Sequence, residues 1–265
     1  MYVSIIGLGF VGNAIRESFL RNNINVFTYD INKKSNSFEE CLNTEYMFLC
    51  LPTLFENNCY NKDAIINTCD KISNYKGIII IKSTVEPFTT QNLGKKYKHL
   101  KFIHNPEFLT TRTSFEDFHN QTHIVLGFNN NINFDDISKL QNFWNTYYPK
   151  AETSFCNSVE SESMKLFCNS FYASKVMLFN EYYLLCRKLN INYDLVKNLM
   201  LRNNWINPMH TNVPGPDGKL AFGGVCFPKD TKALLQFMKK NNSYHNVLQS
   251  VISESEELRN KIVKN

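Results

Sequence analysis

Three glycines near the N-terminus constrain the fold of this chain more than any other feature. The run Gly7-Leu-Gly-Phe-Val-Gly12 directly follows the β-rich segment 2–6 and precedes a helical stretch from about Asn13 to Asn22. A second β-rich segment, 24–29, comes next and closes with Asp30. A strand, a glycine-rich turn, a helix and a second strand within about 30 residues predict a β-α-β unit.

The same alternation continues through the first half of the chain. Further strands are expected at 47–51, 77–82, 101–104, 123–127 and 151–155, and further helices at 63–72 and 135–147. The segment 77–82 is apolar throughout its middle, which is typical of a strand buried on both faces. The pattern predicts an α/β domain built on an open, mostly parallel, doubly wound sheet of the Rossmann type.

The pattern changes near Ser158. Residues 158–189 contain neither glycine nor proline, so we expect one long helix there. Further helices follow to the end of the chain and are interrupted by a loop rich in proline and glycine at 208–224. We therefore predict two domains, a dinucleotide-binding domain over residues 1–156 and an all-helical substrate and dimerisation domain over residues 157–265.

Composition argues against several classes of protein. The net charge of +5 comes without a basic stripe interleaved with aromatic residues, so nucleic-acid binding is not expected. The eight cysteines include no Cys-x-x-Cys pair, which argues against a metal site, and so many unpaired thiols indicate a reducing compartment, the cytoplasm. No apolar run is long enough to span a bilayer, and the first strand begins too early to leave room for a signal peptide.

The glycine run has the form of a dinucleotide-binding turn. Gly7 permits the tight turn, Gly9 lets the backbone approach a pyrophosphate, and Gly12 lets the helix pack against the strand. The helix N-terminus offers N–H groups to the phosphates, and Asp30 can accept hydrogen bonds from ribose hydroxyls. A carboxylate there would repel a 2′-phosphate, so NAD is expected rather than NADP, although Lys33 and Lys34 leave NADP open. The residues assigned to the cofactor from this region are Gly7, Gly9, Phe10, Val11, Gly12, Asp30 and Lys34.

The run Phe222-Gly-Gly-Val-Cys-Phe-Pro-Lys-Asp230 carries the strongest chemical signal. Its glycines allow a ligand to approach the backbone closely. Pro228 suits the first turn of a helix, which places Cys226 at or just before a helix N-terminus. That position favours the thiolate, the nucleophilic form of cysteine, and Asp230 falls in the same first turn. A lone cysteine is more often a small core residue, but these neighbours favour a nucleophile.

Two further candidates follow from their places in the expected elements. Lys165 and Asn169 are four residues apart on the long helix and share one face. Their neighbours along the helix are mostly apolar, which is consistent with a site, and a solvated pair stays the alternative. Glu107 lies in the run 105–109 directly after a predicted strand, at the sheet edge where such folds bind ligands. It is a candidate acid or base, and a structural hydrogen bond is the alternative role for its carboxylate.

Taken together, these runs resemble the UDP-glucose dehydrogenase family, which also includes GDP-mannose and related nucleotide-sugar dehydrogenases. The resemblance extends from Tyr2 to the end of the chain. It rests on six motifs that occur in the family's order: Gly7–Gly12, Leu51-Pro-Thr53, Lys82-Ser-Thr-Val85, Asn105-Pro-Glu-Phe-Leu109, Glu162–Asn169 and Phe222–Asp230.

The resemblance implies a four-electron, NAD-dependent oxidation of UDP-glucose to UDP-glucuronate. Cys226 would capture the aldehyde produced by the first oxidation, and the second oxidation would leave a thioester that water cleaves. Lys165 would stabilise oxyanions with Asn169 beside it. Asp230 would assist proton transfer, and Glu107 would act in hydrolysis of the thioester. By the same resemblance, Pro52, Thr53, Ser83, Thr84 and Lys229 would contact NAD, and Phe108, Leu109, Lys165, Asn169, Phe222 and Gly223 would hold the sugar nucleotide.

The sequence departs from the family in three respects. Members usually continue with a third, C-terminal domain that closes over the nucleotide, and this sequence stops where that domain would begin. The acidic residue that typically follows the run 105–109 is Thr111 here, and an arginine that often reaches a neighbouring subunit's sugar aligns near Trp205. These departures leave the substrate open, so a GDP-mannose or UDP-N-acetylhexosamine dehydrogenase stays an alternative.

Two functions of other kinds also compete. A two-electron alcohol or hydroxyacid dehydrogenase would use Lys165 without needing Cys226, and a non-catalytic NAD-binding dimerisation module would need neither. The joint presence of both residues with Asn169 and Asp230 favours the four-electron enzyme. We also expect a homodimer, because the apolar residues of the long helix exceed what one small helical domain can cover. Phe171, Val176, Phe179 and Tyr183 are the residues on which this expectation is based.

Overall fold

The computed structural model describes residues 1–261, and the chain divides into two compact units. Unit 1 comprises Met1–Glu56 and Tyr60–Lys165. Unit 2 comprises Asn57–Cys59 and the chain from Leu166 onward. The division falls inside a long helix, whereas the boundary predicted near residue 156 lies at the end of the last strand.

Unit 1 is built on a seven-stranded sheet with the order β2-β1-β3-β6-β7-β8-β9. Its strands are β1 (Tyr2–Ile6), β2 (Asn25–Tyr29), β3 (Tyr46–Leu49), β6 (Ile78–Ile81), β7 (Lys101–His104), β8 (His123–Phe128) and β9 (Glu152–Asn157). Neighbouring strands run parallel except β7 and β8, which are antiparallel. The predicted open, mostly parallel, doubly wound sheet is confirmed, with β9 at its edge as expected.

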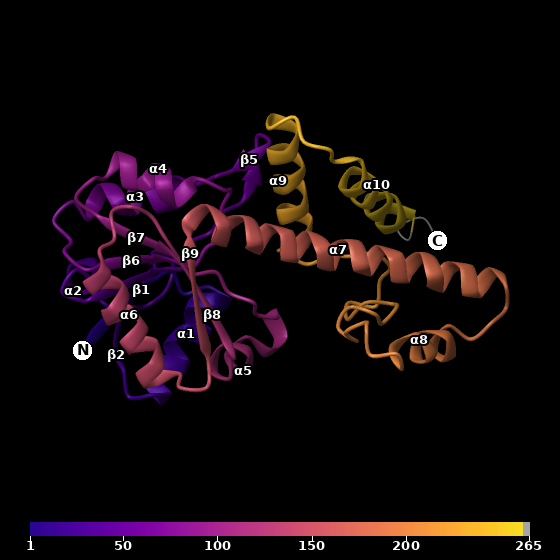
Figure 1. The fold of residues 1–265 in the computed structure, drawn as a ribbon, viewed down its shortest axis with the longest axis horizontal. Coiled ribbons are helices and arrows are strands. Elements are labelled where there is room, and N and C mark those ends of the chain that lie inside the picture. Colours follow the sequence, from indigo (N-terminus) through magenta and orange to yellow (C-terminus); the bar gives the residue numbers. More distant parts are fainter. Residues whose placement is uncertain (262–265) are drawn as a thin grey trace. The chain divides into compact units, whose positions relative to one another are not determined.

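Helices cover both faces of this sheet (Figure 1). Helices α1 (Phe10–Arg21), α5 (Ser114–His119) and α6 (Phe134–Tyr147) pack into one apolar core, and α2 (Phe38–Cys41), α3 (Asp63–Lys71) and α4 (Thr89–Lys96) pack into the other. Successive residues of β6 alternate between the cores, since Ile78 and Ile80 belong to the first core and Ile79 and Ile81 to the second. Burial on both faces therefore explains a strand that is apolar at every position.

Some elements differ from those predicted. α1 begins at Phe10 rather than near Asn13, because Gly9 already has the extended backbone of an N-cap and its carbonyl accepts the Asn13 N–H at 3.0 Å. Helices α2, α4 and α5 have eight residues or fewer, too few to show a helical period in the sequence. α2 does have a local signal, the capping box of Ser37 and Glu40. The short strands β4 (Phe55–Glu56) and β5 (Cys59–Tyr60) and the 3-10 turn η1 (Thr111–Thr113) are likewise unpredicted.

Unit 2 is helical from Leu166 onward, as predicted. The long helix α7 (Ser158–Lys188) begins in unit 1 and continues here, followed by α8 (Tyr193–Leu201), α9 (Phe227–Lys240) and α10 (Asn246–Lys261). An irregular segment, residues 202–226, connects α8 to α9 and contains a cis bond between Val213 and Pro214. None of the helices within residues 1–261 has both the length and the apolar character that crossing a membrane requires.

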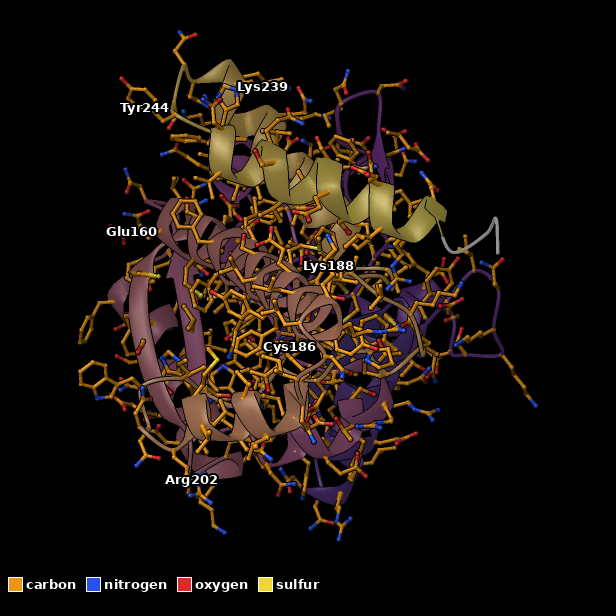
Figure 2. The ribbon with its side chains drawn as sticks, turned by 90° about the vertical axis from the view of Figure 1, so that its right-hand side faces the viewer. Glu160, Cys186, Lys188, Arg202, Lys239 and Tyr244 are labelled. Carbon is orange, nitrogen blue, oxygen red and sulfur yellow. The ribbon has the colours of Figure 1, made fainter. Side chains whose placement is uncertain are left out.

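Two small apolar cores hold unit 2 together. In one of them, Phe179 and Cys186 of α7 pack with Tyr193 and with Tyr183, and Cys186 faces α8 (Figure 2). In the other, Val176 packs with buried residues of α7 and of the loop. The sequence suggested that Val176, Phe179 and Tyr183 lack cover within the domain, and that reasoning is wrong. Loop residues supply the cover, namely Ile206, Val213, Ala221 and Phe222.

A different face of α7 is apolar and exposed. Its members are Phe167, Phe171, Leu178, Tyr182, Leu185 and, just after the helix, Leu189. Their spacing of three, four or seven residues places them on one side of the helix. We call this set the α7 stripe. Of the four residues on which the expected dimer was based, Phe171 belongs to it.

Candidate active site

The glycine turn of unit 1 is sterically defined at two of its three glycines. Gly7 has a φ of +94°, and a Cβ there would lie 2.5 Å from the carbonyl oxygen of Cys50. A Cβ on Gly12 would lie 1.9 Å from the carbonyl oxygen of Gly7. At Gly9, by contrast, a Cβ would meet no atom within 4 Å. Gly7 and Gly12 are therefore needed by the fold, whereas the open space at Gly9, the N-cap of α1, suits the close approach of a phosphate group.

Asp30 lies one strand away from this turn and is tied to it. Its Oδ2 accepts the Leu8 N–H at 2.7 Å and its Oδ1 accepts the Asn32 N–H at 2.8 Å. Partial burial alone would raise the pKa of Asp30, but these N–H donors and the charge of Lys33 outweigh it and hold the pKa below its ordinary value. The Lys33 ammonium donates to the Leu8 carbonyl, whereas the side chain of Lys34 is exposed. Lys33 is thus the lysine in contact with the turn, although the sequence assigned Lys34.

The remaining cofactor candidates of unit 1 follow β3, which is beside β1, and β6, the next strand in the sheet. Thr53 donates its hydroxyl to the Thr84 carbonyl at 2.8 Å. The Ser83 hydroxyl donates to the Leu51 carbonyl at 2.7 Å and accepts the Leu51 N–H at 2.9 Å. Pro52, between them, is exposed. These bonds join the segments that follow β3 and β6, so the structure brings these candidates to the same edge of the sheet as the glycine turn.

Glu107 and Lys165 form a buried ion pair at the same edge. The Lys165 Nζ lies 3.2 Å from Glu107 Oε1 and donates to the Glu107 carbonyl at 2.5 Å. The second carboxylate oxygen accepts the Leu109 N–H at 2.6 Å. The ammonium also lies 5.2 Å from the centre of the Phe108 ring. Two catalytic candidates from positions 58 residues apart are therefore in contact.

The burial of Lys165 has a different cause from the one inferred from sequence. The apolar neighbours expected to surround it include Phe167 and Phe171, and both are exposed. Lys165 and Asn169 are themselves buried. The first part of α7 is thus inverted in polarity, and the Glu107 loop supplies the contacts of Lys165.

Glu162, one turn before Lys165, is a residue whose role sequence reasoning missed. Its Oε1 accepts the Thr90 N–H at 2.7 Å and the Thr90 hydroxyl at 2.6 Å, at the N-terminus of α4. The side chain is fully buried and fixes the start of α7 on the sheet domain. A motif could not have revealed this partner, which lies 72 residues earlier in the chain.

Unit 2 holds the other catalytic candidates. Cys226 is the N-cap of α9, with Pro228 in the first turn, as the sequence predicts. Asp230 is fully buried one turn into the helix, and its N–H donates to the Cys226 carbonyl at 2.9 Å. Asn169 Nδ2 donates to Asp230 Oδ2 at 2.6 Å. The other carboxylate oxygen pairs with Lys229, which the sequence assigned to the cofactor.

The segment before Cys226 is held by an arginine that sequence reasoning also missed. A Cβ on Gly223 would lie 2.5 Å from Nη2 of Arg259 on α10. Arg259 donates to the Ala221 carbonyl at 3.0 Å and forms an ion pair with Asp217 at 2.7 Å. The Phe222 side chain is buried in a core of unit 2, which leaves its backbone as the part available to a substrate.

Each unit therefore carries half of the predicted chemistry. Unit 1 combines the glycine turn with a lysine–glutamate pair, and unit 2 combines a cysteine at a helix N-terminus with a buried aspartate and its asparagine donor. Over residues 1–261 there is no cluster of three or more histidine, cysteine or acidic side chains that could hold a metal ion.

The matches to known proteins agree with this chemistry. Residues 33–145 match the NAD binding domain of the UDP-glucose/GDP-mannose dehydrogenase family, and residues 159–256 match its central domain. A UDP-glucose 6-dehydrogenase of Rickettsia bellii is 30% identical over 302 aligned positions, which cover 97% of this chain and 67% of that protein. The chain belongs to the UDP-glucose/GDP-mannose dehydrogenase family. It spans about two thirds of the length of this relative.

Membership of the UDP-glucose/GDP-mannose dehydrogenase family confirms the predicted enzyme class, an NAD-dependent dehydrogenase, and its cofactor. Solved structures agree on the fold. A UDP-glucose dehydrogenase from Pyrobaculum islandicum matches with a TM-score of 0.84 at 22% identity, covering 97% of this chain and 68% of that one. A 3-hydroxyisobutyrate dehydrogenase from Mycobacterium tuberculosis matches with a TM-score of 0.76 at 13% identity, covering 97% and 92%. At such identities the likeness concerns the fold alone.

Gly9→Ala should weaken NAD binding without unfolding the protein. The added Cβ meets no protein atom, but it occupies the space that a pyrophosphate must enter, so the dissociation constant for NAD should rise about tenfold or more, or about 1.4 kcal/mol. Calorimetric titration measures the affinity and a thermal melt measures the fold. The matched variant Gly12→Ala places its Cβ against the Gly7 carbonyl and should lower the melting temperature instead. Unchanged NAD affinity in Gly9→Ala would contradict the assigned role.

Glu162 should make stability depend on pH. Burial raises the pKa of Glu162 to about 7, although the Thr90 donors oppose the rise. An unfolded glutamate titrates near 4.5, so the folded protein keeps the proton up to about pH 7 and loses stability as pH rises through that interval. Between about pH 5 and about pH 7.5, the urea midpoint of the wild type should therefore fall by more than that of Glu162→Gln, which lacks the titrating carboxyl group. Glu152→Gln, at an exposed position on β9, should keep the larger fall. A dependence that persists in Glu162→Gln would argue against this assignment.

Proposed function

We propose that the chain oxidises UDP-glucose to UDP-glucuronate in a four-electron reaction in which Cys226 is the nucleophile. The observation that carries this proposal is the position of Cys226 at the N-cap of α9, with the buried Asp230–Asn169 pair one turn away. A helix N-terminus stabilises a thiolate, and a buried carboxylate beside it can accept protons. A two-electron oxidation has no use for this arrangement.

In this proposal unit 2 handles the covalent step. NAD, held by the glycine turn and Asp30, would supply the hydride acceptor for both oxidations. The Cys226 thiolate would bond to the aldehyde carbon left by the first oxidation and keep the aldehyde from escaping. Asp230 would move protons through water, with Asn169 orienting its carboxylate.

Unit 1 supplies the ammonium of Lys165 and the carboxylate of Glu107, the two charged groups that would act on the substrate and on water. The Lys165 ammonium would face the negative charge that develops on the substrate oxygen in each step. Glu107 would direct the water that cleaves the thioester. Its pairing with Lys165 supports both roles, because one contact holds both groups in place. Assignment of residues 1–156 to the cofactor and 157–265 to substrate and dimerisation is part of the proposal, as are the other substrate contacts, Phe108, Leu109, Phe222 and Gly223.

The choice of substrate follows the relatives. UDP-glucose is favoured because the similar proteins from two Rickettsia species are named UDP-glucose 6-dehydrogenases. GDP-mannose and UDP-N-acetylhexosamines are the alternatives within the family. The cytoplasm remains the proposed compartment, because the cysteine content of the sequence is typical of a reducing environment.

The stoichiometry of NADH tests the function. With limiting UDP-glucose, the purified protein should form two NADH per sugar, and Cys226→Ser should form at most one, because it lacks the thiolate that captures the aldehyde. Absorbance of NADH measures both. GDP-mannose and UDP-N-acetylglucosamine are the comparison substrates. One NADH per sugar, retained in Cys226→Ala, would favour a two-electron dehydrogenase, and NAD binding without turnover of any sugar would favour a non-catalytic module.

A homodimer through the α7 stripe is the second part of the proposal. The stripe runs over 23 residues, from Phe167 to Leu189, or roughly 33 Å of helix. Two copies of such a stripe complement each other across a two-fold axis, since each helix offers the same apolar side chains to the other. A second copy of this chain is therefore its proposed partner.

Charge in the stripe should break the dimer. Leu178→Asp places a carboxylate in the middle of the proposed interface and should convert a dimer to a monomer in light scattering. Leu20→Asp, at a similarly exposed leucine of α1, should leave the dimer intact. A wild type that is monomeric at micromolar concentration, or a Leu178→Asp variant that stays dimeric, counts against this interface.

A further inference from the structure

A second lysine lies inside unit 1 beside the Glu107 loop. Lys82 directly follows β6, and it is 2% exposed. Its Nζ donates to Asn105 Oδ1 at 2.9 Å and to the Pro106 carbonyl at 3.3 Å, and it lies 5.5 Å from the centre of the Phe118 ring. The two residues that Lys82 holds are therefore those that immediately precede Glu107.

Folding alone does not explain a lysine in this place. Within the described chain, Lys82 forms no ion pair. The carboxylate of the adjacent loop, Glu107, pairs with Lys165 instead. Burial lowers the pKa of Lys82 to about 8. The folded protein therefore binds the Lys82 proton more weakly than the unfolded chain does, and the buried charge destabilises the fold below about pH 8. An apolar side chain would fill the same space at a lower cost in stability.

Four other titratable groups face Lys82. Glu107 favours its charged form, whereas Lys165 opposes it. Cys50, after β3, is a neutral thiol near pH 8, because burial raises its pKa to about 12. His104 of β7 is fully buried, and burial together with the Lys82 charge lowers its pKa to about 3, so it is neutral near pH 7. The cluster thus holds two ammonium groups around one carboxylate.

We propose that Lys82 is a positioning residue, whose ammonium fixes Asn105 and Pro106 so that Glu107 meets Lys165. Asn105 is held from the opposite side, since its Nδ2 donates to the Val125 carbonyl at 2.8 Å. Glu107 then follows a backbone that is anchored at two consecutive residues. The catalytic meaning of this role rests on the proposed function, but the Glu107–Lys165 contact itself can be measured without turnover.

The test follows Lys165 by NMR in protein with lysine labelled at Cε. In Lys82→Met, which keeps the length of the side chain without its charge, the Lys165 resonance should move toward its position in Glu107→Gln, where the carboxylate is gone. Lys101→Met is the matched control, because Lys101 pairs with Asp136 and lies at the start of β7, whereas the Glu107 loop follows the end of this strand. It should leave the Lys165 resonance in place. An unmoved Lys165 resonance in folded Lys82→Met would overturn the proposal.

The wild type provides an arm that does not depend on a variant folding. Raising the pH through about 8 removes the Lys82 proton without any substitution, so the Cε resonances of Lys82 and Lys165 should shift with a shared midpoint of about 8. A Lys165 resonance that stays flat while the Lys82 resonance shifts would also overturn the proposal.

Kinetics separate this inference from the proposed function. Where UDP-glucose is oxidised, Lys82→Met should lower kcat about tenfold or more, while KM for NAD stays within about twofold, because Lys82 does not contact the glycine turn. A kcat equal to that of Lys101→Met would contradict the positioning role. If the wild type oxidises no sugar nucleotide, the proposed function fails, and the two NMR measurements still decide the role of Lys82.

Discussion

The shared direction of β1, β2, β3, β6 and β7 is the constraint on which the sheet domain depends. A strand such as β6, apolar at every position, requires helices on both faces, and the crossovers between parallel strands supply them. The same direction brings the residue that follows each strand to one edge of the sheet. Asp30, Thr53, Thr84 and Glu107 gather at this edge although they are far apart in sequence.

Local constraints made much of this predictable. A side chain at Gly7 or Gly12 would clash with the backbone of the turn itself or of the segment after β3, so both positions require glycine. Pro228 predicts the start of the helix that Cys226 caps. The long helix was predictable because nothing in 158–189 interrupts it. The partners of charged groups were not predictable, since Thr90 for Glu162 and Asp217 for Arg259 depend on how distant segments pack. Short helices such as α5 were missed because they complete less than two turns.

Stability and chemistry place opposite demands on the carboxyl edge. Burial favours neutral groups, yet Glu107 is buried there, and so are Lys82 and Lys165, which both contact the Glu107 loop. Hydrogen bonds that the ammonium groups donate to carbonyl oxygens, together with a single ion pair, offset part of the cost of taking these charges out of water. The remainder is a cost that packing in the two apolar cores must outweigh. Such a site is stiff, because any side chain that moves leaves a buried charge without its partner.

Helix α7 shows how one element can serve both demands. Along an ordinary surface helix, apolar side chains are buried and charged ones are exposed. In α7, Glu162, Lys165 and Asn169 are buried, whereas Phe167 and Phe171 are exposed. Each buried polar side chain has a named partner, Thr90, Glu107 and Asp230 in turn, although Oε2 of Glu162 accepts no hydrogen bond within the described chain. The phenyl groups of Phe167 and Phe171 stay largely exposed, and the proposed second copy of the chain would cover them. The same inversion that directs catalytic candidates inward therefore turns an apolar stripe outward, which links the proposed active site to the proposed dimer.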